Sequence, residues 1–182
     1  MIELSLHILD IVENSTRSGA DTVRISIMEN TSKDVVTLEI HDDGSGMNEE
    51  ILKQVIDPFF TTKTVRRVGL GLPLLAQAAE AAGGKFDIES TRDEGTRVTA
   101  IFKLSHIDRQ PLGDMAGTMV TLIAGNTGRT FIYRHQHDGN DYLLDTREIK
   151  KELGEIAINR TEVLALISTD IKEGLREIGA LA

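Results

Sequence analysis

The feature that most constrains the fold is an alternating apolar run that ends in an acidic turn with two glycines. Residues 36–41 read Val-Thr-Leu-Glu-Ile-His, and Asp42-Asp43-Gly44-Ser45-Gly46-Met47 follows directly. The alternation predicts a half-buried strand. Asp42 then stands at the strand end, where its carboxylate can accept hydrogen bonds from a ligand amine. The glycines leave room for a flat ligand, and Met47 offers it an apolar surface. Taken alone, an ordinary loop turn is the commoner explanation of such residues.

Composition narrows the class of protein. The 182 residues suffice for one sizeable core with an appended subdomain. The formal net charge of -9 argues against nucleic acid or an anionic membrane as the main partner. The absence of cysteine excludes disulfides, thiolate catalysis and zinc–thiolate sites. Because there is no basic leader and no apolar run of membrane-spanning length, we expect a soluble cytoplasmic protein.

Periodicity along the first 105 residues predicts alternating helices and strands. The expected order is helix, two strands, short helix, loop, helix and two strands, which predicts an α/β two-layer sandwich with helices on one face of one sheet. The predicted elements are a helix over 4–17, strands over 22–28 and 35–41, a short helix after an Asn48 cap, a loop over 57–68, a helix from 69 through 82, and strands over 85–90 and 96–104.

A boundary is predicted near 105–111, dividing the chain into a domain over 1–105 and a small mixed α/β extension over 106–182. The extension is predicted to hold a helix over 114–124, a hairpin with strands over 130–134 and 142–145, and helices over 147–153 and 161–178. His135 and His137 alternate on one strand face, where an exposed hairpin is favoured over a metal site.

Two polar residues share a face of the first predicted helix. Asp10 and Asn14 are four residues apart. Asp10 can orient or deprotonate a nucleophile, and the Asn14 amide oxygen is a hard ligand suited to Mg²⁺ beside phosphates. A solvated polar helix face is the alternative.

Two later segments carry phosphate-binding chemistry. In Phe59-Phe60-Thr61-Thr62-Lys63, the lysine can neutralise phosphate charge and the threonines can donate hydrogen bonds. Gly69-Leu70-Gly71-Leu72 opens a helix, where backbone amides and the helix dipole favour an anion. The alternatives are an aromatic plug under a polar loop for the first segment and a flexible junction for the second.

The order of these four motifs over residues 4–104 closely resembles the GHKL ATP-binding family of gyrase, Hsp90, histidine kinases and mismatch-repair ATPases. The resemblance implies the Bergerat-type ATP-binding fold. Val12-Glu13-Asn14-Ser15 followed by Ser18-Gly19-Ala20 is similar to the mismatch-repair branch, whereas residues 59–63 and 69–72 are similar to histidine kinases.

The resemblance also implies roles for single residues. Asp10 takes the position usually held by a glutamate general base, Asn14 that of the Mg²⁺ ligand, and Asp42 that of the adenine-binding carboxylate, beside a merely solvated Asp43. The residues implied to bind Mg-ATP are Asn14, Asp42, Gly44, Gly46, Met47, Thr62, Lys63, Gly69, Leu70, Gly71, Leu72 and Thr96.

Two departures from the family pattern bear on activity. Asp10 is one methylene shorter than glutamate, which weakens the case for efficient hydrolysis but not for ATP binding. The segment over 64–68 is short for an ATP lid, although Arg66 and Arg67 can still reach a γ-phosphate. We also expect no phosphoacceptor hairpin ahead of this fold, and His7 is interpreted as a packing or surface residue rather than a phosphoacceptor.

Two functions therefore stay open. The first is a Mg-ATP-binding signalling kinase that transfers the γ-phosphoryl group to a separate protein partner. The second is a non-catalytic or slow ATP-dependent switch that regulates a partner. A DNA-repair-type clamp is disfavoured by size and charge, and homodimerisation remains open.

Overall fold

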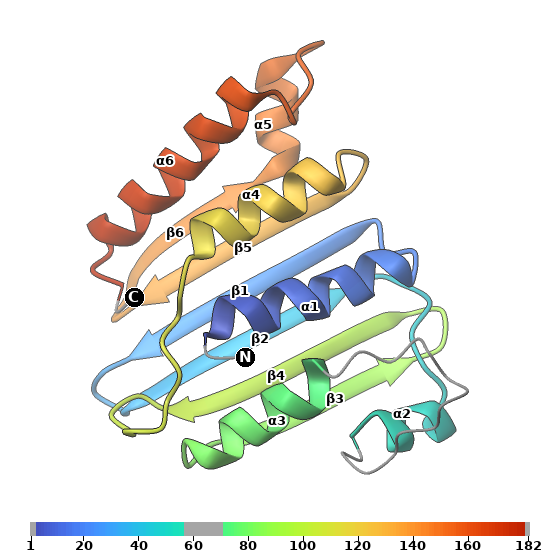
Figure 1. The fold of residues 1–182 in the computed structure, drawn as a ribbon, viewed down its shortest axis with the longest axis vertical. Coiled ribbons are helices and arrows are strands. Elements are labelled where there is room, and N and C mark those ends of the chain that lie inside the picture. Colours follow the sequence, from blue (N-terminus) through green and yellow to red (C-terminus); the bar gives the residue numbers. More distant parts are fainter. Residues whose placement is uncertain (1–2, 57–70, 181–182) are drawn as a thin grey trace.

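The computed structural model of the chain describes residues 3–56 and 71–180. Helices and strands follow one another in the predicted order (Figure 1). They are α1 (Leu4–Arg17), β1 (Thr22–Asn30), β2 (Val35–Asp42), α2 (Glu49–Ile56), α3 (Gly71–Ala81), β3 (Lys85–Thr91), β4 (Gly95–Lys103), α4 (Met115–Gly125), β5 (Thr130–His137), β6 (Asn140–Asp145), α5 (Thr146–Leu153) and α6 (Thr161–Glu177).

The strands form one six-stranded sheet in the order β3-β4-β2-β1-β5-β6. The pairs β1·β2, β2·β4, β3·β4 and β5·β6 are antiparallel, whereas β5 runs parallel to β1. In the middle of the sheet Ile25 lies opposite Ile40 on one side and Tyr133 on the other. The predicted α/β two-layer sandwich is therefore confirmed.

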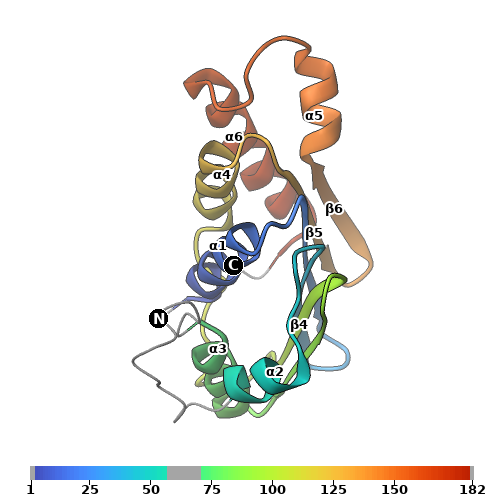
Figure 2. The ribbon, with the colours of Figure 1, turned by 90° about the vertical axis from the view of Figure 1, so that its right-hand side faces the viewer.

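Strand alternation gives the sheet one buried and one open face. Helices α1, α3 and α4 lie on the same side of the sheet (Figure 2). In β2 the buried positions are Val36, Leu38, Ile40 and Asp42, and the intervening side chains are partly exposed on the other face. Each fully buried aliphatic side chain of this layer contributes about 1.5–3 kcal/mol to stability. The apolar stripe of α1 meets this face through Leu4, Ile8, Ile11 and Val12.

The predicted hairpin of the extension is present as β5 and β6. Its two central residues, Asp138 and Gly139, have φ angles of 45° and 92°, as a tight two-residue hairpin turn requires. Both strands continue the sheet of the first 105 residues, because β5 pairs directly with β1. Helix α4 packs against both α1 and α6. The strands on either side of the predicted boundary thus share one sheet and one core.

The prediction of an exposed hairpin is wrong for His135. Its side chain is fully buried and its Nε2 lies 2.6 Å from Oε1 of Glu29, which is itself 3% exposed. Its Nδ1 lies 2.8 Å from the Tyr133 hydroxyl. Burial, followed by the charge of Glu29, raises the pKa of Tyr133, so this hydroxyl stays protonated and can donate to Nδ1. A neutral imidazole with its proton on Nε2 satisfies both contacts.

Candidate functional site

Asp42 is the last residue of β2, and its side chain is only 5% exposed. The Ser15 hydroxyl of α1 donates to Oδ2 at 2.5 Å, and the Gly44 amide donates to Oδ1 at 2.9 Å. A carboxylate offers about four acceptor positions. These two neutral donors therefore leave Asp42 able to accept further hydrogen bonds.

Three glycines around Asp42 hold positions where a side chain would not fit. A Cβ at Gly44 would overlap the Ser18 hydroxyl, and one at Gly46, whose φ is 59°, would overlap the Thr91 carbonyl. A Cβ at Gly95 would overlap the carbonyl oxygen of Asp42 itself. The turn is thus closely packed between the end of α1 and the β3–β4 turn, which explains the glycine spacing.

Met47 and Thr96 are joined to the same turn through Ser90 of β3. The Met47 amide donates to the Ser90 hydroxyl at 2.9 Å, and the Thr96 hydroxyl lies 2.9 Å from the same oxygen. In the sheet Thr96 lies directly opposite Asp42. The structure therefore brings Asp42, Gly44, Gly46, Met47 and Thr96 together.

Asp43 is not merely solvated, which corrects the sequence interpretation. It is exposed, but its Oδ1 accepts the amides of Asp21 at 2.7 Å and Thr22 at 2.8 Å. Partial burial acts to raise the pKa of Asp43, yet these hydrogen bonds outweigh it and lower the pKa. The side chain thereby ties the end of β2 to the start of β1.

A second group of residues lies farther along α1. Asp10 precedes Ser15 by five residues, about 7.5 Å along the helix axis. Its Oδ2 is buried and has no hydrogen-bond partner among residues 3–56 and 71–180. A Cβ at Gly71, the first residue of α3, would overlap this oxygen. Asp10 and the start of α3 are thus in close contact, with a carboxylate oxygen whose acceptor capacity is unused within this part of the chain.

Asn14 lies on α1, one turn after Asp10, and is half-buried. Its Oδ1 accepts a hydrogen bond from Nη1 of Arg17 at 3.3 Å, and Arg17 also pairs with Glu13 at 3.1 Å. An amide oxygen has two lone pairs, so one acceptor position remains.

Leu72 follows Gly71 in α3, where its partly buried side chain packs against the hydrophobic core.

Four predicted site residues, Thr62, Lys63, Gly69 and Leu70, lie outside the described residues, as do Arg66 and Arg67. Their roles stay predictions from the sequence.

Sequence reasoning missed Ser15. This residue is 4% exposed and continues the apolar stripe of α1, four residues after Ile11 and three after Val12. A hydroxyl on an apolar stripe needs a buried partner, and here that partner is Asp42. The signal was therefore present in the sequence as a polar residue at a core-facing helical position.

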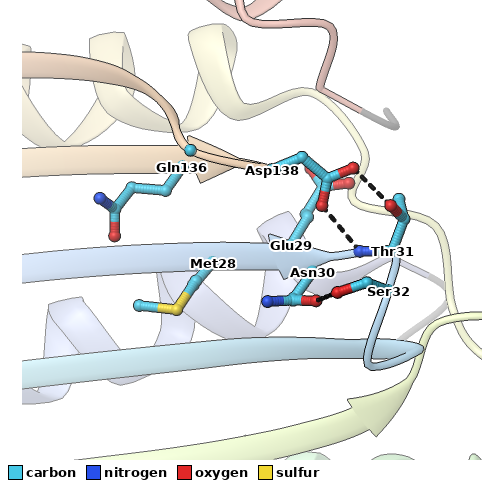
Figure 3. Close-up of a pocket in the computed structure, with 8 residues that line it drawn as sticks. Met28, Glu29, Asn30, Thr31, Ser32, Gln136 and Asp138 are labelled. Atoms are coloured by element: carbon cyan, nitrogen blue, oxygen red, sulfur yellow. Dashed lines mark hydrogen bonds between the residues drawn. The ribbon is translucent and has the colours of Figure 1, made fainter.

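A hollow in the surface lies at the other end of the sheet, between the β1–β2 and β5–β6 turns (Figure 3). Hydrogen bonds within and between those turns engage Asp138 and Asn30, two of the polar residues that line it. Asp138 accepts both the amide and the hydroxyl of Thr31. The Asn30 Oδ1 accepts the Ser32 hydroxyl at 2.8 Å. We therefore place the candidate site at Asp42 and not in this hollow.

No cluster of three or more histidine, aspartate or glutamate side chains within 3–56 and 71–180 is arranged to hold a metal ion. None of the helices in that part of the chain is both long and apolar enough to cross a membrane.

Comparison with protein families gives a match over more than half of the chain. The family described as "Histidine kinase-, DNA gyrase B-, and HSP90-like ATPase" matches residues 2–106. The matched range contains α1, the Asp42 turn and the start of α3, which are the three parts of the candidate site.

Comparison with curated proteins gives sensor proteins. The sensor protein KdpD of Clostridium acetobutylicum is 35% identical over 105 residues, which cover 54% of this chain and 11% of that protein. The sensor protein SrrB of Staphylococcus aureus is 34% identical over 109 residues, which cover 57% of this chain and 18% of that protein. The chain thus spans less than a fifth of the length of these relatives.

Comparison with solved structures extends past the matched range. A crystal structure of the "N terminal domain of a DNA repair protein" aligns with a TM-score of 0.55 at 15% identity, over 87% of this chain and 59% of that one. This likeness concerns the fold, and its coverage includes part of the region after residue 106.

Proposed function

The chain belongs to the histidine kinase-, DNA gyrase B-, and HSP90-like ATPase family, and on this premise we propose that it binds Mg-ATP and transfers the γ-phosphoryl group to a separate partner protein. The sensor proteins it resembles support a role in signalling.

The surroundings of Asp42 carry the proposal. A buried carboxylate is costly unless its acceptor positions are filled. Here two small neutral donors, Ser15 and Gly44, fill only some of them. An exocyclic amine on a flat base fits this arrangement. The amine can donate a hydrogen bond to Asp42, and the base can approach because the neighbouring residues 44 and 46 are glycines. Asp42 would therefore read the adenine amino group, with Met47 against the ring and Thr96 beside it.

The second half of the site, at Asp10, would take the phosphates. The unused Oδ2 of Asp10 suits a general base that accepts a proton from the attacking hydroxyl or imidazole. The oxygen of Asn14 suits a Mg²⁺ ligand. Bound Mg²⁺ would neutralise charge on the phosphate oxygens. The amides at Gly71 and Leu72, with Gly69, Leu70, Thr62 and Lys63 assigned by family resemblance, would clamp the phosphates.

A second function is favoured by one observation. Asp10 stands where the family pattern has glutamate, and its carboxylate is one methylene closer to the helix. A nucleophile placed for glutamate would lie too far from it, and a small misplacement lowers the rate steeply. ATP would then act as a switch that changes partner binding rather than as a phosphoryl donor.

Radiolabel transfer from γ-labelled ATP to candidate partners separates the two functions. We expect label on a partner with the unaltered chain, and loss of that label in Asp10→Ala and Asn14→Ala. Asp87→Ala is the matched control, because Asp87 is an exposed carboxylate on the open face of β3. Transfer that persists in Asp10→Ala would contradict the assignment of the base. Nucleotide-dependent capture of a partner without any label would favour the switch.

A further inference from the structure

The segment that leaves the matched fold passes along the start of α1. Residues 104–114, here called the connector, join β4 to α4 and run past the N-terminal end of α1 (Figure 1). The side chain of the N-cap residue Glu3 makes no capping hydrogen bond to α1. Instead, the amides of Leu4 and Ser5 donate to the connector carbonyls of Pro111 at 3.0 Å and Leu112 at 2.8 Å. Since first-turn amides have no partner within their helix, the connector caps α1.

The close approach of the connector to α1 depends on a glycine. Gly113 has a φ of 80°, and a Cβ there would overlap the side chains of Glu3 and Ser5. Immediately after it, the Asp114 side chain accepts the Gly117 amide and caps α4. The connector therefore joins the capped ends of two helices, one in each region of the chain.

One side chain of α1 reaches the connector from the buried face. His7 is 1% exposed, and its Nε2 lies 2.9 Å from Oε1 of Gln110. Burial lowers the pKa of His7, and the hydrogen bond with Gln110 offsets this only in part, so the imidazole is neutral near pH 7. Its Nδ1 is also buried and has no hydrogen-bond partner among the described residues.

The same histidine adjoins the phosphate half of the candidate site. Helix α1, which carries His7, packs against α3, and the Gly71 backbone acts to raise the pKa of His7, against the larger effect of burial. Gly71 in turn contacts Asp10, which lies three residues after His7 on α1. His7 thus stands between the connector, the first residue of α3 and the Asp10 carboxylate. Asp42 instead contacts α1 at Ser15, eight residues after His7.

We propose that Gln110 and His7 are positioning residues through which the connector fixes Asp10 and the start of α3. The region after residue 105 then sets the geometry of the phosphate half of the site and leaves the adenine half unchanged. A partner bound to that region can change the response to ATP by shifting the connector. This proposal rests on the proposed function for its nucleotide readout, but the contact itself is testable without nucleotide.

The nucleotide-free test is amide hydrogen exchange on the full chain. The Leu75 amide reports on the start of α3, because its helical acceptor is the Gly71 carbonyl. We expect Gln110→Ala to raise the Leu75 exchange rate about tenfold relative to the central β1 amide of Ile25. Ile107→Ala is the matched control, since Ile107 lies on the same connector and is 95% exposed. It should change neither amide.

The nucleotide test is calorimetric titration with Mg-ATP and Mg-ADP. Gln110→Ala should weaken ATP binding about tenfold and ADP binding less than about twofold, because only ATP carries the γ-phosphate that Asp10 and α3 face. Gln110→Glu retains an acceptor for His7 and should restore ATP binding to within about threefold. A purely structural role would weaken both nucleotides alike.

The outcomes separate the two proposals. Unchanged Leu75 exchange in Gln110→Ala, or equal weakening of ATP and ADP, would overturn the positioning role. If the unaltered chain binds neither nucleotide while Leu75 still responds to Gln110→Ala, the proposed function fails and the connector's hold on α3 stands.

Discussion

Asp42 and Glu29 are two buried carboxylates that face the same helical layer from adjacent strands, about 20 Å apart along the strand direction. Asp42 is held by a hydroxyl and a backbone amide, with glycines around it. Glu29 is held at 2.6 Å by the imidazole of His135, with Tyr133 behind it. Burial is almost the same for both, at 5% and 3% exposure.

Asp42 and Glu29 differ in their hydrogen-bond partners and not in how deeply they are buried. Small neutral donors leave Asp42 with acceptor capacity and leave space where a ligand can approach. An imidazole fills the space beside Glu29 and links β1 to β5 across the two regions of the chain. A buried acid therefore indicates a binding site only when its neighbours are small and its acceptor positions are incompletely filled.

The largest effect on stability is expected from removing the Glu29 carboxylate. Removing the Glu29 carboxylate leaves the buried Nε2–H of His135 without this acceptor, so Glu29→Ala should lower the free energy of unfolding by about 1–3 kcal/mol. Urea denaturation measures it. Glu39→Ala, on the open face of β2, is the control and should cost less than about 1 kcal/mol. Equal losses in the two variants would show that the His135 contact does not join the strands.

A smaller effect is expected on the Asp42 side from Ser15→Ala. This change removes the donor to Oδ2 and should weaken ATP binding about tenfold, because the carboxylate loses its fixed orientation. Thr16→Ala is the matched control, since the Thr16 hydroxyl donates to the Glu13 carbonyl of its own helix. Calorimetric titration at constant pH gives both affinities. Full affinity in Ser15→Ala would mean that the glycine turn alone positions Asp42.

The smallest effect concerns Asp43 and appears only in acid. Hydrogen bonds from Thr22 and Asp21 lower its pKa in the folded state below the ordinary value of 3.8. The stabilisation they give is therefore complete above that value and is lost as pH falls through the lower folded pKa. Thermal unfolding between pH 6 and about pH 2 should show the gap in stability between the unaltered chain and Asp43→Asn narrowing below about pH 4. A constant gap would place the acid sensitivity elsewhere.

Much of the fold was predictable because periodicity reports which residues share a face. The alternation before Asp42 predicted its place at a strand end, and the stripe of α1 predicted its buried side. The order of strands was not predictable, because no local pattern states that β5 lies parallel to β1. His135 is buried because β5 pairs with β1 and the helices cover that face of the sheet. Since the pairing was not predictable, the burial of His135 was not predicted either.

The motifs of the candidate site were predictable from the sequence, but the buried residues that contact and orient them were not. Asp42 and its glycines were identified from spacing. Ser15 and His7 were not identified as site residues, although both interrupt the apolar stripe of α1 and both are buried in the structure. Their partners, Asp42 and Gln110, are 27 and 103 residues away in sequence, and such contacts follow only from the assembled fold.

The most direct test of the central claim is titration of Mg-ATP into the unaltered chain, Asp42→Asn and Glu29→Gln. Asparagine retains an acceptor for the Gly44 amide but presents an amino group to the adenine amine. We therefore predict at least about a hundredfold loss of affinity in Asp42→Asn. Glu29→Gln should be less stable yet bind ATP with unchanged affinity. Unchanged affinity in Asp42→Asn, or no binding by the unaltered chain, would contradict the adenine site.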